Sequence, residues 1–340
     1  MKILVIQKKR IGDVLTSTII LEALKEKYPE SELHYLIYPN SLAVVANNPF
    51  IDKLILLDEV TKKSKLKFLR FIFKIRKEKY DIVVDAYGKP NSILIGWLSG
   101  AKTRITYSKK YSEIFYTHSM VRNKLSFSNA TLAIEHRMLL LQPLGIDFKA
   151  YKPKIILTQD EKEVAKTYLT QNNINFEKPI IMISAVGSRD FKTYPLKYMA
   201  KVLEYTTKNN NAQLLFNYMP DQKSIADELY SLCNIETQNA IFMNIYQNDI
   251  RKFLGITSLC NALIGNEGGA TNMAKALNIP TFTIFAPGIP KHGWNMFENE
   301  TTNISVHLHD FLPLENSYEK FEPSLFKEQL KTFLNYNCTR

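Results

Sequence analysis

Short apolar runs alternate with longer amphipathic stretches along almost the whole chain, and this alternation restricts the fold more than any other feature. Residues 2–6, 33–37, 53–56 and 81–85 read as strands. Between the first two, Leu15, Ile19, Ala23 and Leu24 recur at helical spacing. Further helices are predicted at 64–79 and 131–144. Strands that alternate with helices favour parallel sheets built from βαβ units.

A second series of the same kind begins after residues 146–178, a less regular stretch. Strands are predicted at 180–184, 213–216, 240–243, 262–265 and 281–285, with helices at 196–205, 221–233, 250–259 and 270–277; the irregular stretch itself holds a polar helix at 160–171. The 340 residues suit two domains of roughly 150 residues each. We therefore predict two doubly wound α/β domains, residues 1–155 and 156–320. We expect a helix in residues 321–340 to pack back toward the first domain.

The charge balance predicts an anionic partner. Lys and Arg number 44 against 33 Asp and Glu, a formal net charge of +11. Such an excess suits nucleic acid, acidic lipid or a phosphorylated substrate. The helix predicted within residues 62–79 is strongly basic, and its apolar side chains are too many for one buried stripe. We expect it to contact an anionic membrane surface; a solvated helix with ordinary core residues is the alternative.

Several absences narrow the function classes. The chain has no Gly-x-Gly-x-x-Gly, no P-loop, no Gly-x-Ser-x-Gly elbow, no Asp-x-Asp pair and no histidine-rich spacing. These absences disfavour dinucleotide oxidoreductases, P-loop enzymes, serine hydrolases and metal sites. Three cysteines without a Cys-x-x-Cys pair suit a reducing compartment. No run approaches the ~20 apolar residues of a membrane helix, and no nucleic-acid-binding motif is present.

The first loop, residues 8–14, joins a predicted strand to a predicted helix. Gly12 permits a tight turn there, and Asp13 lies at or near the helix N-terminus, which favours its ionised form. In doubly wound sheets this loop lies at the carboxyl ends of the strands, where ligands bind. An ionised carboxylate at that position can act as a general base. A helix-capping aspartate with no further role is the alternative.

Two loops of the second half carry phosphate-binding chemistry. Ser188, Arg189 and Lys192 follow the strand at 180–184 and could neutralise a diphosphate leaving group in place of a metal ion. The alternative is a solvated basic loop. The loop at 266–272 holds Gly268 and Gly269, which allow a ligand to approach the backbone N–H groups closely. The alternative there is a glycine-rich turn with Glu267 on the helix dipole.

These loops, in this order, resemble glycosyltransferase family 9, the heptosyltransferases of lipopolysaccharide core assembly. The similar segments are Ile11-Gly12-Asp13-Val14, residues 80–85 and 102–105, Glu135-His136 with 139–146, Ser188 to Pro195, and Asn266 to Leu277 with Pro280 and Phe285. The last segment departs from the family's Asp-Ser/Thr-Gly-x-x-His pattern. Glu267 replaces the aspartate, Gly268 the hydroxyl residue and Asn272 the histidine.

The resemblance implies a GT-B fold, with two Rossmann-like domains facing across a cleft. It implies metal-independent sugar transfer with inversion, with Asp13 as the base, Lys192 as the donor-phosphate lysine and Ser188 as the phosphate-binding hydroxyl. The donor nucleotide-sugar would lie on the second domain, held also by Arg189, Glu267, Gly268, Gly269 and Ala270. The acceptor would lie on the first domain, beside Lys8, Arg10 and Gly12.

We therefore expect a glycosyltransferase that moves heptose from ADP-heptose to the lipopolysaccharide core or a related anionic glycolipid. It would have no cofactor and bind no nucleic acid, and would work in the cytoplasm, peripherally on the inner face of the bacterial inner membrane. The alternatives are a different donor sugar, a nucleotide-sugar epimerase of the same architecture, or a non-catalytic binding module.

Overall fold

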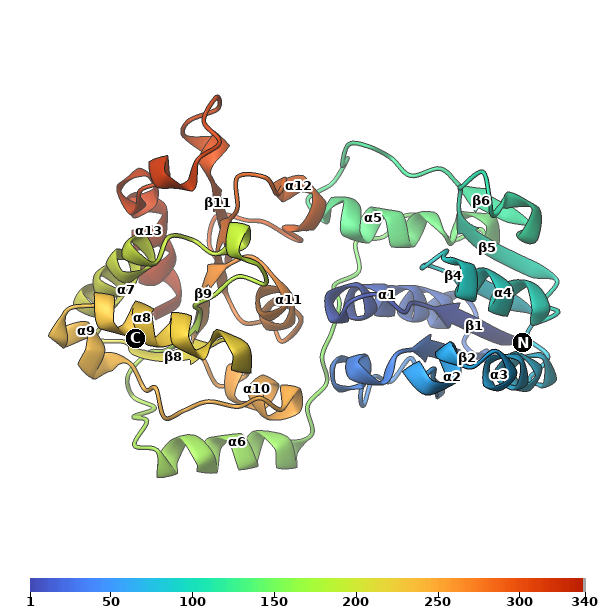
Figure 1. The fold of residues 1–340 in the computed structure, drawn as a ribbon, viewed down its shortest axis with the longest axis horizontal. Helices are drawn as coiled ribbons and strands as arrows, with labels where there is room; N and C mark the ends of the chain where they lie inside the picture. Colours follow the sequence, from blue (N-terminus) through green and yellow to red (C-terminus); the bar gives the residue numbers. More distant parts are fainter. Residues whose placement is uncertain (339–340) are drawn as a thin grey trace. The chain divides into compact units, whose positions relative to one another are not determined.

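Each half of the chain is built around a parallel β-sheet of its own. The computed structural model describes residues 1–338. The chain divides into two compact units, Met1–Ile156 and Leu157–Arg340 (Figure 1). The boundary predicted from the sequence lies between residues 155 and 156.

The first unit contains a six-stranded sheet in the order β3-β2-β1-β4-β5-β6, with all neighbouring strands parallel. The strands are β1 (Lys2–Ile6), β2 (Glu32–Ile37), β3 (Lys53–Leu56), β4 (Ile82–Asp85), β5 (Thr103–Tyr107) and β6 (His118–Met120). The strand order reverses between β1 and β4, so the loops after these two strands flank the switch point where ligands bind in such sheets.

Helices cover both faces of the first sheet. Helix α1 (Ile11–Lys27) packs against α5 (Thr131–Leu139), and α3 (Lys65–Lys77) packs against α4 (Pro90–Leu98). Leu4 and Ile6 of β1 join the core cluster formed with α3 and α4. Because side chains alternate along a strand, the buried Ile3 and Val5 point to the opposite face. The remaining elements are α2 (Glu59–Lys63) and the short 3₁₀ turns at Pro39–Val44, Glu113–Phe115 and Gln142–Leu144.

The second unit repeats this plan with a five-stranded parallel sheet in the order β11-β10-β9-β7-β8. The strands are β7 (Ile180–Ser184), β8 (Gln213–Asn217), β9 (Ala262–Asn266), β10 (Thr281–Phe285) and β11 (Asn303–His307). The helices are α6 (Gln159–Gln171), α7 (Leu196–Asn210), α8 (Lys223–Leu232), α9 (Ile235–Ala240), α10 (Ile250–Thr257), α11 (Gly269–Ala276), α12 (Lys291–Trp294) and α13 (Lys327–Cys338).

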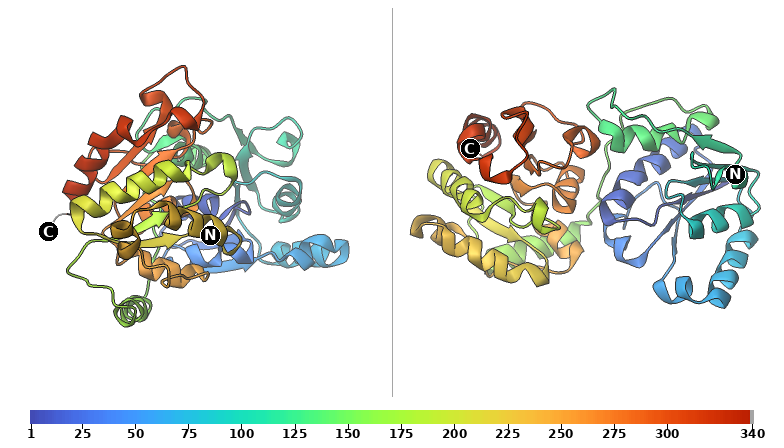
Figure 2. Two further views of the ribbon diagram at one scale, coloured as in Figure 1. Left: turned by 60° about the vertical axis from the view of Figure 1, so that its left-hand side comes forward. Right: turned by 45° about the horizontal axis from the view of Figure 1, so that its top comes forward.

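Two sequence expectations differ from the structure. Residues 240–243 form no strand: Ile241 makes only an isolated bridge to Leu214. The basic segment is two helices, because Ser64 ends α2 and caps α3 by accepting the Lys67 N–H. Helix α13 packs against α7 (Figure 2), and its buried side chains belong to the core of the second unit. Within residues 1–338, no helix is both long enough and apolar enough to cross a membrane.

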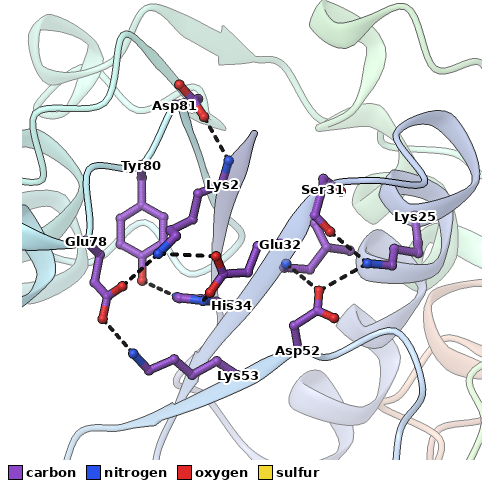
Figure 3. A network of polar contacts seen from close by, with 11 residues as sticks. Lys2, Lys25, Ser31, Glu32, His34, Asp52, Lys53, Glu78, Tyr80 and Asp81 are labelled. Carbon is purple, nitrogen blue, oxygen red and sulfur yellow. Dashed lines mark hydrogen bonds and ion pairs between the residues drawn. The ribbon is translucent and has the colours of Figure 1, made fainter.

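A polar network ties together the amino ends of the first sheet, the edge opposite the switch-point loops. Its members lie on β1, β2, β3 and the turn after α3, and they are Lys2, Glu32, His34, Lys53, Glu78 and Tyr80 (Figure 3). Glu78 lies 2.6 Å from Lys53 Nζ and 3.0 Å from Lys2 Nζ. These two lysines, Lys53 foremost, lower the pKa of Glu78 to about 2. The network joins segments that are distant in sequence and so favours the observed strand register.

We expect Glu78→Gln to lower the melting temperature of the first unit by about 2–6 °C at pH 7, because losing the charge costs about 1–2 kcal/mol after solvent screening. The folded-state pKa lies below the ordinary 4.5, so this stabilisation is complete above about pH 4.5 and is lost as the pH falls through about 2. Calorimetric melting across that range measures it. Glu30→Gln, an exposed carboxylate of the same unit, is the control. Identical melting of Glu78→Gln and wild type at pH 7 would contradict the prediction.

Candidate functional site

Asp13 is held at the start of helix α1, at the switch point of the first sheet. It is the third residue of the helix, and the N-cap residue is Arg10, so the reading of Asp13 as a cap is wrong. Its side chain is almost completely buried and carries the negative charge in the first turn of α1. That place favours the ionised carboxylate through the helix dipole.

An arginine from a distant helix fixes the Asp13 carboxylate. Arg137 on α5 donates from Nη2 to Asp13 Oδ1 at 3.0 Å, and from Nε to Ser17 Oγ at 3.2 Å. Both partners of the ion pair are nine-tenths buried, with side-chain exposures of 8% and 10%. A buried guanidinium that is anchored by more than one hydrogen bond holds its partner in one orientation. The second oxygen, Asp13 Oδ2, lies 3.5 Å from the exposed Lys9 Nζ.

The other cations of this loop do not form one basic surface. Arg10 is exposed, whereas Lys8 is only 1% exposed. Of the two cations expected beside the acceptor, Arg10 is therefore at the surface and Lys8 is not. Gly12 is half-buried in the first turn, and its carbonyl accepts the Thr16 hydroxyl.

In the second unit, the loop after β7 folds back tightly on itself. A Cβ added to Gly187 would lie 2.5 Å from the backbone of Lys192, so only glycine fits there. The Gly187 N–H also donates to Thr193 Oγ1. This close approach brings Lys192 back over the start of the loop, while Ser188 and Arg189 remain exposed at its tip.

A buried asparagine fastens that loop to the next strand. Asn266, at the carboxyl end of β9, accepts the Tyr194 N–H at 2.7 Å and donates to the carbonyls of Ser184 and Ala185 at 2.8 and 3.0 Å. It is fully buried. Three hydrogen bonds from one amide fix both ends of the loop, so the position of Lys192 follows from the register of β7 and β9.

Lys192 and Glu267, both expected at the donor site, form a buried ion pair. Lys192 Nζ lies 2.5 Å from Glu267 Oε1, and the two side chains are 17% and 9% exposed. The glutamate that replaces the family's aspartate therefore reaches the lysine directly. In a pair of this kind the carboxylate holds the ammonium group in place when no ligand is bound. A phosphate can then take the place of that carboxylate beside the lysine.

Space is free above the glycines that follow Glu267. A Cβ built on Gly268 or Gly269 meets no atom within 4 Å. Gly268 caps helix α11, which begins at Gly269 and continues through Ala270. Open space in front of a helix N-terminus allows an anionic group to approach the backbone N–H groups.

The loop after β10 is anchored by a partly buried cation. Lys275 of α11 donates to Asn295 Oδ1 at 2.7 Å and to the Met296 carbonyl at 2.9 Å. Burial lowers the pKa of Lys275 to about 7. This anchor holds the residues that follow α12 against α11.

The structure thus brings Lys192, Glu267 and the glycine pair together at the carboxyl ends of β7 and β9, and places Asp13 at the corresponding end of β1. Sequence reasoning missed Arg137 and the clamp role of Asn266. Arg137 directly follows Glu135-His136 and precedes the apolar residues 138–141. This charge beside an apolar run is the only local feature of the sequence that could have indicated a buried, functional arginine. Among residues 1–338, no group of three or more His, Cys, Asp or Glu side chains gathers in a way that could hold a metal ion.

Comparisons with known proteins agree on one family. The model of glycosyltransferase family 9 (heptosyltransferase) matches residues 68–316, a range that includes Lys192 and Glu267 and begins after Asp13. The lipopolysaccharide heptosyltransferase 1 of Campylobacter coli is 24% identical over 293 residues, which cover 84% of each protein.

Solved structures show the same fold. A glycosyltransferase of family 9 from Veillonella parvula superposes with a TM-score of 0.77 at 18% identity over 97% of both chains. The ADP-heptose lipopolysaccharide heptosyltransferase II of Escherichia coli superposes with a TM-score of 0.75 at 16% identity, over 97% of this chain and 98% of that one. Because the family model covers most of the chain and the two Rossmann-like sheets are those of these structures, the chain belongs to glycosyltransferase family 9 and is a glycosyltransferase of the GT-B fold.

Proposed function

We propose that this glycosyltransferase moves heptose from ADP-heptose to an anionic glycolipid of the lipopolysaccharide core type, with inversion at the anomeric carbon. The observation that carries the proposal is the buried Asp13 carboxylate, oriented by Arg137 at the switch point of the first sheet. The names of the similar proteins, which are lipopolysaccharide and ADP-heptose heptosyltransferases, support this choice of donor and acceptor.

In the proposed reaction, Asp13 accepts the proton of an acceptor hydroxyl. The hydroxyl oxygen attacks the anomeric carbon of heptose as the bond from that carbon to the β-phosphate oxygen breaks, and ADP leaves. Arg137 holds Oδ1, so Oδ2 is the oxygen that takes the proton. A positioned base of this kind contributes about 10²–10⁴ in rate. Arg10, Gly12 and Lys8 lie in the same loop and would contact the acceptor.

In the second unit, the donor diphosphate would replace Glu267 as the partner of Lys192. Arg189 and Ser188, exposed at the loop tip, would contact the same phosphates, and the N–H groups at Gly268, Gly269 and Ala270 would face them. Glu267, once released, would accept hydrogen bonds from hydroxyls of the donor. Fixed cations stabilise a departing diphosphate in the way a metal ion does elsewhere, so the proposed transfer uses none.

The first unit also carries a surface suited to an anionic membrane. Leu66, Leu69 and Phe73 of α3 are 59%, 49% and 62% exposed and lie on one face of the helix. Lysines and arginines flank this stripe, and α3 has no acidic residue. A helix of this composition lies in the interface of an anionic bilayer. We propose that it docks the enzyme on the cytoplasmic face of the inner membrane, where its glycolipid acceptor would be found.

The proposed heptose transfer is tested by incubating the purified protein with ADP-heptose and heptose-free lipopolysaccharide. The mass of the product is then measured by mass spectrometry. Product formation with another nucleotide-sugar from a panel would identify a different donor. Incubation without acceptor reports an epimerase, which would change the donor alone. A mass increase of one heptose only when both substrates are present is the expected result.

Asp13→Asn should lower the transfer rate about 10²–10⁴-fold with little effect on ADP binding. Asparagine keeps the size and can still accept from Arg137, whereas alanine would leave that guanidinium without its carboxylate. Initial rates at saturating substrates provide the measurement, and Asp52→Asn, at the opposite edge of the first sheet, is the control. Transfer at the wild-type rate by folded Asp13→Asn would remove Asp13 from the mechanism.

Lys192→Gln should weaken ADP binding by about 1.5–3 kcal/mol, because a charge-assisted contact with the diphosphate is lost. Glutamine can still donate to Glu267, so the loop should keep its fold. Calorimetric titration with ADP measures the change against Lys197→Gln, an exposed lysine at the start of α7. Unchanged ADP affinity in the Lys192 variant would show that this loop does not hold the diphosphate.

Charge reversal at Lys67, Arg70 and Lys74 should release the protein from vesicles that contain anionic phospholipid, since each cation near such a surface is worth about 1 kcal/mol. Co-sedimentation at low and high salt measures binding. Reversal of Lys162, Lys166 and Lys208 in the second unit changes the net charge equally and is the matched control. Binding that ignores salt, or that survives the α3 reversal, would favour an ordinary solvated helix.

A further inference from the structure

Lys8 is a buried cation with no hydrogen-bond partner. Its side chain is 1% exposed, and among residues 1–338 no atom accepts a hydrogen bond from its Nζ. Lysine is rarely buried in this way, because an ammonium group that leaves water needs acceptors for its three N–H donors. Natural proteins keep such unsatisfied groups mainly where a ligand or a reaction uses them.

The position of Lys8 is that of a ligand-binding residue. It lies two residues after the end of β1, at the switch point between β1 and β4. The rings of Tyr38, which follows β2, and Tyr87, in the loop after β4, each have their centroid 5.7 Å from Lys8 Nζ. Both tyrosines are only half-buried. The ammonium group therefore lies beneath two aromatic side chains that reach the surface.

The neighbouring charges do not compensate Lys8 fully. Asp85 attracts it, but the Asp85 oxygens already accept from the N–H groups of Tyr87 and Gly88 and from the Tyr116 hydroxyl. On α2, Lys62 repels Lys8 and Glu59 attracts it, and these two side chains pair with each other. Burial, the largest effect, lowers the pKa of Lys8 to about 8. The free protein thus bears the cost of a desolvated charge.

Tyr87 also relates Lys8 to the candidate base. Burial raises the pKa of Tyr87, and the charges of Asp85 and Asp13 add to the rise. Tyr87 therefore lies within electrostatic reach of both Asp13 and Lys8. Lys8 and Asp13 both lie in the short segment between the end of β1 and the first turn of α1, so a molecule bound at Asp13 would have Lys8 close to its other groups.

We infer that Lys8 is a concealed anion-binding group, covered by Tyr38 and Tyr87, which takes an acidic oxygen of the acceptor when one of these rings moves aside. The inference deepens the proposed function, since it rests on the acceptor lying on the first unit. The ligand is a carboxylate or phosphate, because three N–H donors and one positive charge match the oxygens of either group. Binding would supply the acceptors that the ammonium group lacks in the free protein.

The first test compares Lys8→Met with Lys62→Met. Methionine keeps the length and apolar stem of lysine without the charge, and Lys62 is matched because its Nζ lies 5.1 Å from the same Tyr38 ring but is paired with Glu59. We expect Lys8→Met to melt about 3 °C or more above wild type, because a desolvated charge is removed. Lys62→Met should not be stabilised.

Anion binding is measured by NMR or calorimetric titration with two probes, inorganic phosphate and the sugar acid 3-deoxy-D-manno-octulosonic acid. The two probes distinguish a phosphate on the acceptor from a carboxylate. Affinity for the preferred probe should fall at least tenfold in Lys8→Met and stay within twofold of wild type in Lys62→Met. Tyr87→Ala, which removes part of the cover, should bind that probe more tightly than wild type.

The pH dependence gives an independent readout. Lys8 must be charged to hold an anion, so wild-type affinity for the sugar acid, whose carboxylate stays ionised, should fall as the pH rises through about 8. In Lys8→Met that fall should be absent. Asp85, Glu59, Lys62, Tyr38 and Tyr87 are the titratable groups that face Lys8, and each is retained in this variant.

Three results would overturn the inference. They are probe affinity that is unchanged in Lys8→Met, a Lys8→Met protein that is less stable than wild type or fails to fold, and no binding of either probe by wild type or Tyr87→Ala. None of these measurements uses a sugar donor. Failure of heptose transfer would therefore refute the proposed reaction alone, and failure of anion binding would refute the role of Lys8 alone.

Discussion

The parallel register of each sheet determines where the candidate functional groups of this protein lie. In a parallel sheet every strand ends at the same edge, so the loops after β1 and β4, and those after β7 and β9, are neighbours although they are distant in sequence. Asn266 makes this dependence concrete. Its three hydrogen bonds connect the end of β9 to both ends of the loop that carries Lys192. A slip of one residue between β7 and β9 would turn this amide to the other face of the sheet.

Two buried ion pairs then hold the reactive side chains. Arg137 orients Asp13 in the first unit, and Glu267 holds Lys192 in the second. Buried pairs of this kind add little net stability, because desolvation offsets most of the attraction. Their value lies in orientation, since each fixes a charged group before any ligand arrives. The second pair is also suited to exchange, because a diphosphate can take the place of the Glu267 carboxylate beside Lys192.

Lys8 represents the opposite arrangement, a buried charge whose Nζ has no acceptor among residues 1–338. The amino edge of the same sheet shows what a purely structural solution looks like, since Lys2 and Lys53 there share Glu78 at hydrogen-bonding distance. Within one sheet, the amino edge therefore carries charges that stabilise the fold, and the carboxyl edge carries a charge suited to binding a ligand. The charges at the amino edge are paired and connect neighbouring strands. At the carboxyl edge, the unpaired charge of Lys8 lowers the stability of the free protein and provides a ligand-binding group.

The sequence by itself determined the two-domain α/β architecture, most element positions and the loops that carry Asp13, Lys192 and Glu267. It could do so because apolar runs and helical spacing record burial locally, and because glycines and charges after a strand mark the ligand-binding edge. Residues 240–243 show the limit of that signal. The run is apolar enough for a strand, yet it makes only an isolated bridge to β8, between Ile241 and Leu214.

Tertiary structure alone decided which groups meet. Arg137 and Asp13 are 124 residues apart, and no local pattern pairs them. Lys8 sits in a run of three basic residues, and only the folded chain shows that it is buried while its neighbours Lys9 and Arg10 are exposed. The physical reason is the same in each case. Periodicity encodes how far a residue is removed from water, whereas its partners depend on the strand order and on the loops that this order brings together.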